Sequence, residues 1–61
     1  AYACVVSIAD IKKGEKFTRS NIWVKRPGTG EIKAIDYKKV IGKRAKENIS
    51  SDVQLKWKNI K

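Results

Sequence analysis

The two ends of the chain resemble each other. Residues 11–22 (IKKGEKFTRSNI) can be laid over residues 49–60 (ISSDVQLKWKNI) without a gap, and both segments end on an Asn-Ile pair. The overlay matches Gly14 with Asp52 and Phe17 with Leu55. A solenoid needs about three repeats or more, so two copies in a small chain predict a pseudo-twofold fold of intertwined short strands.

Short apolar runs and turn signals predict the individual elements. The apolar residues at 3–8 and 22–24 predict two short strands, and residues 44–49 predict a third. Residues 35–41 predict a short helix that Asp36 caps at its start and Gly42 ends. The expected fold class is therefore mostly β, with one or two short helical turns.

The size of the chain limits what it can do alone. Its 61 residues form one predicted domain, 1–61. A domain this small buries only about 60% of its unfolded surface, which leaves little room for an enclosed active site. The chain starts at Ala1, without Met and within an apolar segment, and we therefore expect it to be a piece of a longer protein.

Candidate catalytic and metal-binding residues are scarce. The sequence has no histidine and one cysteine, and its six carboxylates are dispersed among lysines. We therefore predict no catalytic residue and no metal site, and no enzymatic activity for the isolated domain. Cys4, in an apolar run, is expected to be a buried thiol. A lone cysteine cannot form an internal disulfide, which favours a reducing compartment and a cytoplasmic location.

The net charge of +9 admits several anionic partners. Nucleic-acid binding is the main alternative function, with lysines on phosphates and Trp23 or Trp57 stacking on bases. The basic residues are scattered along the sequence rather than grouped in runs, which favours an ordinary solvated surface. Trp23 lies between Ile22 and Val24, so a core or interface position is expected for it, whereas Trp57 alternates with lysines and is expected to be half-exposed. No segment is apolar for long enough to cross a membrane.

The strongest loop signal in the chain is Lys25-Arg26-Pro27-Gly28-Thr29-Gly30. Pro27 fixes its own φ and biases Arg26 toward extended conformations. The two glycines permit a tight turn. A guanidinium in such a loop presents a rigid plane of donors, although a solvated basic loop is the alternative interpretation.

Four motifs in order resemble those of one family: ADIKKGEKFT at 9–18, NI followed by KRPGTG at 21–30, Tyr37 with IGKRA at 41–45, and NI at 48–49. They are similar to the C-terminal antifreeze-like (SAF) domain of bacterial sialic acid synthases, including legionaminic and pseudaminic acid synthases. The resemblance runs from about Val5 to Ile60. The chain departs from the family pattern in residues 31–34 (EIKA), directly after the loop.

The resemblance implies a small β-clip fold and a role as a substrate cap. In that family a (β/α)8 barrel condenses phosphoenolpyruvate with N-acetylmannosamine or a related sugar, and the barrel holds a divalent Mn or Mg ion. The SAF domain of one subunit covers the barrel of the other in a domain-exchanged homodimer. Carried over by motif, Arg26 is the substrate-binding residue, supported by Lys25, Pro27, Gly28, Thr29 and Gly30.

Two further functions share this fold. Type III antifreeze proteins bind ice, but a chain that is 34% charged offers few faces free of ammonium groups, so ice binding is not expected. The SAF domain of a flagellar P-ring assembly chaperone is the other alternative. The RPGTG and IGKRA motifs fit the synthases better.

Overall fold

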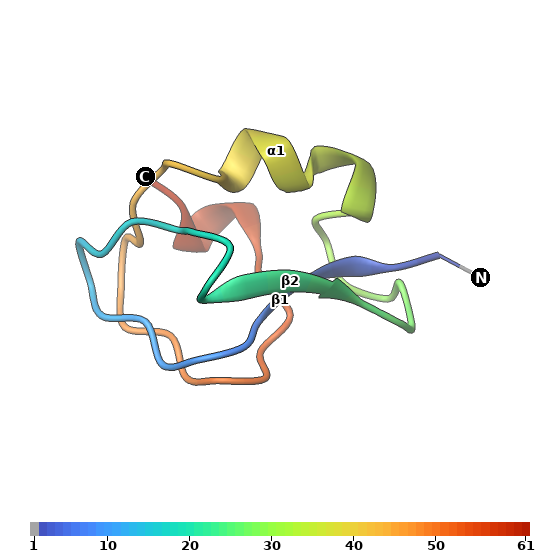
Figure 1. Cartoon of the computed structure of the whole chain (residues 1–61), viewed down its shortest axis with the longest axis horizontal. Coiled ribbons are helices and arrows are strands. Elements are labelled where there is room, and N and C mark those ends of the chain that lie inside the picture. Colours follow the sequence, from blue (N-terminus) through green and yellow to red (C-terminus); the bar gives the residue numbers. More distant parts are fainter. Residues whose placement is uncertain (1) are drawn as a thin grey trace.

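A computed structural model describes residues 2–61 and shows a small domain of mostly irregular chain, about 32 × 20 × 19 Å (Figure 1). Its two strands are β1 (Cys4–Ser7) and β2 (Ile22–Lys25). Its helical elements are the 3-10 turn η1 (Ala34–Asp36), the helix α1 (Tyr37–Val40) and the 3-10 turn η2 (Trp57–Asn59). This content confirms the expected β-clip class. Within the described residues, no helix is long and apolar enough to cross a membrane.

Strand β1 lies at the centre of the molecule. It pairs antiparallel with β2, with Val5 opposite Val24. On its other edge, isolated bridges join Cys4 to Lys33 and Val6 to Gln54. Because neighbouring chain covers both edges, all four residues of β1 are buried. The predicted buried thiol, Cys4, is one of them.

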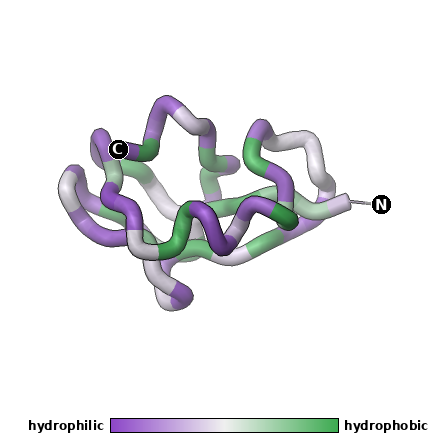
Figure 2. Tube along the Cα trace, turned by 90° about the horizontal axis from the view of Figure 1, so that it is seen from above, coloured by the Kyte–Doolittle hydropathy of each residue, from purple (hydrophilic) through white to green (hydrophobic). Residues whose placement is uncertain are grey.

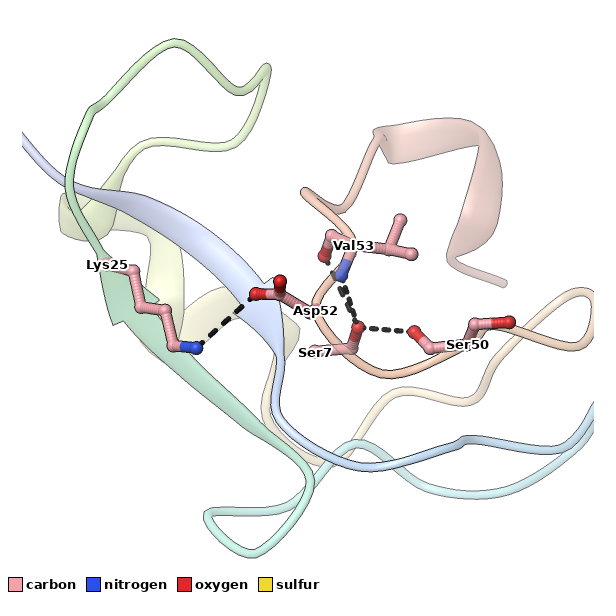
Figure 3. A network of polar contacts seen from close by, with 5 residues as sticks. All are labelled: Ser7, Lys25, Ser50, Asp52 and Val53. Carbon is pink, nitrogen blue, oxygen red and sulfur yellow. Dashed lines mark hydrogen bonds and ion pairs between the residues drawn. The ribbon is translucent and has the colours of Figure 1, made fainter.

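A buried hydroxyl ties β1 to the C-terminal repeat (Figure 3). The Ser7 hydroxyl donates to the carbonyl oxygen of Ser50 at 2.6 Å and accepts from the amide of Val53 at 2.9 Å. A buried hydroxyl without partners would cost free energy. The two contacts satisfy this hydroxyl and fix residues 50–53 against the strand.

The internal repeat has a direct structural counterpart. Ile11 and Ile49, the first residues of the two copies, bridge antiparallel and exchange two backbone hydrogen bonds of 2.7 Å. The turn residues that the repeat matches, Gly14 and Asp52, both have positive φ, of 88° and 64°. Asp52 is the one non-glycine residue with this conformation among residues 2–61.

The Asn-Ile pairs that end the copies form matching turns. The side-chain oxygen of Asn21 accepts from the amide of Thr18, and that of Asn59 accepts from the amide of Lys56, both at 2.8 Å. Each asparagine also donates to a glutamate side chain, Asn59 to Glu47 at 2.6 Å. The pseudo-twofold arrangement predicted from the sequence is therefore present in the fold.

The core contains few residues and comes from every part of the chain. Its members are buried aliphatic or aromatic side chains: Val5, Ile11, Phe17, Ile22, Ile32, Val40, Ala45, Ile49 and Leu55. Figure 2 shows that apolar segments are short and are interrupted by polar ones along the trace. Each short segment therefore contributes one or two side chains, and no single element forms the core.

Two sequence expectations need correction. Residues 44–49 do not form a strand, because they make only single, isolated bridges. Arg44 and Ile49 bridge to residues 16 and 11 of the first repeat copy, and Ala45 bridges to Ile60. The helical region divides into η1 and α1, and Asp36 stands at the start of α1 without a side-chain capping bond. The Asp36 carboxylate instead pairs with Lys39 at 3.2 Å. Gly42 follows with φ 89°, as expected for a helix-ending glycine.

Candidate functional site

The loop after β2 crosses the end of β1. Residues 26–31 leave β2 on one edge of β1, and the chain returns on the other edge, where the amide of Val5 donates to the Ile32 carbonyl at 2.8 Å. The amide of Ala34 then donates to the Ala3 carbonyl at 3.0 Å. Both ends of the loop are thus anchored on the central strand. The Arg26–Pro27 peptide bond within it is cis.

Side chains from outside the loop hold it in place, one through the loop backbone and one through a loop side chain. The Lys33 ammonium donates to the carbonyl oxygens of Gly28 at 2.6 Å and Gly30 at 3.0 Å. The Gln54 amide donates to the Thr29 hydroxyl at 2.8 Å. Charge-assisted hydrogen bonds such as those of Lys33 are stronger than neutral ones, so this side chain is the main clamp on the loop.

The two loop glycines are required by close packing. A Cβ on Gly28 would lie 2.7 Å from the backbone of Tyr2, and one on Gly30 would lie 2.8 Å from the Cys4 sulfur. Neither position has room for a side chain without a shift of its neighbours. The glycines let the loop lie directly on the start of β1.

Arg26 is exposed and has no partner within residues 2–61. Its neighbour Lys25 pairs with Asp52 at 3.4 Å (Figure 3). The Arg26 guanidinium makes no such ion pair in the described part of the chain, so its donors are available to a ligand. A fixed loop therefore carries an unpartnered guanidinium.

A mostly apolar groove of about 500 Å³ lies beside the loop. Its lining is Tyr2, Ala3, Gly28, Lys33, Ala34 and Ile35. Tyr2 is 83% exposed and Ile35 is 88% exposed. Both side chains therefore leave apolar surface exposed at the same groove.

The structure brings the predicted site residues together and adds two that the sequence did not indicate. Lys33 and Gln54 hold the loop, and Lys33 belongs to the segment that departs from the family pattern. In the same segment, Glu31 accepts from the amide of Trp57 at 2.8 Å at the start of η2. Residues 31–34 thus secure the loop from its C-terminal side.

The two tryptophans differ from each other. Trp23 is 52% exposed and packs against Tyr37, with ring centroids 5.4 Å apart in an edge-to-face arrangement. Of the two positions expected for Trp23, core or interface, this exposure excludes the core, since Trp23 lies on the solvent side of β2. The interface position stays a prediction. Trp57 is 40% exposed, which confirms the half-exposed position predicted for it.

The loop offers the hydrogen-bond donors of Arg26 beside a mostly apolar groove. Within residues 2–61, no three His, Cys, Asp or Glu side chains are grouped so that they could hold a metal ion.

Comparison with known proteins agrees with this geometry. The SAF domain family matches residues 2–61. The chain belongs to the SAF domain family. This SAF domain is also 44% identical over 48 residues to the N,N'-diacetyllegionaminic acid synthase of Campylobacter jejuni subsp. jejuni serotype O:2. The match covers 79% of the domain but 14% of that synthase. The resemblance to synthase SAF domains found in the motifs is confirmed.

Proposed function

We propose that this SAF domain caps the active site of a sialic-acid-type synthase and that Arg26 contacts the sugar substrate there. The synthase named among its relatives supports an enzyme of this kind as the parent protein. The observation that carries the proposal is an exposed, unpartnered guanidinium on a loop fixed from both sides.

The parent would condense phosphoenolpyruvate with an N-acetylmannosamine-like sugar in the cytoplasm. Its (β/α)8 barrel would hold the Mn or Mg ion, as the resemblance to synthases implies. The isolated domain would have no condensation activity.

The barrel that this domain covers would belong to the partner subunit in a domain-exchanged homodimer. The groove beside the loop supports such a contact, because Tyr2 and Ile35 would leave water when a second protein surface covers them. Full burial of a large apolar side chain contributes about 1.5–3 kcal/mol. The contact would set Arg26 at the barrel mouth without a long flexible tether.

The contribution of Arg26 is to bind and orient. Its guanidinium can donate two parallel hydrogen bonds to a carbonyl or hydroxyl pair of the sugar. The bonds from Lys33 and Gln54 fix residues 28–30 of the same loop before substrate arrives, so less entropy is lost in ordering the loop on binding. The covering domain would also exclude water from the barrel mouth.

The test is a substitution series in the full-length synthase. Arg26→Ala should lower kcat/KM for the sugar by about 10- to 150-fold, the equivalent of the 1.5–3 kcal/mol typical of a hydrogen bond to a charged group. Arg26→Lys should recover only part of the loss, because an ammonium lacks the planar pair of donors. The thermal stability of the domain should be unchanged, since Arg26 is exposed.

Arg19→Ala is the matched control. Arg19 is an exposed arginine in the turn before β2, and its removal subtracts the same charge. Its kinetics should equal those of the wild type. Wild-type kinetics in Arg26→Ala would refute the capping role of Arg26.

A further inference from the structure

A second groove, of about 330 Å³, lies away from the Arg26 loop. Four cationic residues line it together with Gly14 and Ala45: Lys13, Arg44, Lys46 and Lys61. In Figure 1 the segments that carry them lie at the end of the long axis near the C label, whereas the green loop after β2 lies at the opposite end. The groove is therefore separate from the proposed capping site.

The floor of this groove is well-fixed backbone. The amide of Gly14 donates to the carbonyl oxygen of Ala45 at 2.8 Å, and the amide of Lys61 donates to the carbonyl oxygen of Arg44 at 2.9 Å. The Arg44 guanidinium also donates to the Gly14 carbonyl at 2.9 Å. These bonds join three chain segments that are distant in sequence, so the four cationic residues are held together by the fold.

The cationic side chains of the groove make no ion pair within residues 2–61. The two ion pairs found in residues 2–61 join Lys25 to Asp52 and Lys39 to Asp36, and neither pair involves the groove. Glu15 and Glu47, the sequence neighbours of Gly14 and Lys46, accept hydrogen bonds from asparagine side chains and make no ion pair with the groove lysines. Four like charges around one small space repel one another, and a bound anion would relieve that repulsion.

We propose that this groove is a binding site for a small anion that carries several phosphate groups, such as a polyphosphate or the phosphate chain of a nucleotide. Several charges are needed because a single anionic group would leave most of the four cations uncompensated. The volume is at the lower limit of ordinary ligand pockets and suits a compact ligand. Arg44 uses one donor on Gly14 and keeps the rest of its guanidinium for bidentate contact with phosphate oxygens.

The proposal is tested on the 61-residue chain with inorganic tripolyphosphate as the probe. Binding is followed by calorimetry and by amide chemical shifts. The largest shifts should fall on Gly14, Ala45 and Lys46. The double variant Lys13→Ala/Lys46→Ala should raise the Kd about tenfold or more.

The matched control is Arg19→Ala/Lys38→Ala, which removes the same two charges from residues outside the groove lining. It should change the Kd for tripolyphosphate less than about twofold. These residues attract the anion only through long-range electrostatics, which salt screens. Circular dichroism of both variants confirms that they are folded.

Three outcomes would overturn the proposal. Equal weakening in both double variants would show that net charge alone attracts the anion. Shifts centred on residues 25–30 would place the anion in the Arg26 loop. A short DNA duplex that displaces tripolyphosphate at lower phosphate concentration would show that the groove serves nucleic acid. None of these measurements involves synthase activity, so failure here is distinct from failure of the capping role.

Discussion

Lys33 should be the most sensitive lysine in the domain, because its ammonium holds two loop carbonyls at 2.6 and 3.0 Å. Lys33→Met keeps the aliphatic stem and removes both bonds. A net hydrogen bond contributes about 0.5–1.5 kcal/mol, so two bonds on an exposed side chain should cost about 1–2 kcal/mol. For a domain of this size, each kcal/mol lowers the Tm by roughly 4–8 °C.

The assay is thermal unfolding by circular dichroism, with Lys38→Met on α1 as the control. Lys38 is exposed and makes no ion pair within residues 2–61, so its substitution should leave the Tm nearly unchanged. Amide exchange at Gly28 to Gly30 should also accelerate in Lys33→Met alone. Equal Tm values for the two variants, with unchanged exchange in the loop, would refute the clamp role of Lys33.

Three further predictions follow from packing, backbone conformation and charge. Gly30→Ala should destabilise the domain by about 1–3 kcal/mol in denaturant titrations, because its Cβ would meet the Cys4 sulfur; a loss below about 0.5 kcal/mol would contradict that packing. Gly14→Ala should cost about 1 kcal/mol from positive φ alone, whereas Asp52→Asn should cost less than about 0.5 kcal/mol since it removes one exposed ion pair. Millimolar protein should show no thermal hysteresis, and faceted ice crystals would contradict the exclusion of ice binding.

The internal repeat is the part of the fold that could be predicted best from the sequence. It matched Ile11 with Ile49 and Gly14 with Asp52, and the structure bridges the first pair and gives the second the same positive φ. The strand predicted at 44–49 failed because local apolar content does not indicate how many partners a segment has. Its isolated bridges to two separate segments, residues 11–16 and Ile60, come from the tertiary fold.

The candidate site could be predicted only in outline. Turn chemistry located the loop at residues 25–30, and the motif resemblance pointed to Arg26. The clamp by Lys33 could not be foreseen, because a long lysine side chain can reach many acceptors and its choice depends on loop geometry. The same holds for Gln54, which lies 25 positions from its partner Thr29. The sequence also left open whether Trp23 is a core or an interface residue, since flanking apolar residues do not show which face of a strand is buried.

The most direct test of the central claim is complementation between subunits of the full-length synthase. One subunit carries Arg26→Ala with an intact barrel, and the other carries an inactivated barrel with Arg26 intact. If the SAF domain of one subunit caps the barrel of the other, random mixing into dimers should restore about a quarter of the wild-type activity, because half of the dimers are mixed and each has one complete site. Activity no higher than the sum of the two separate mutants would contradict capping across the dimer by Arg26.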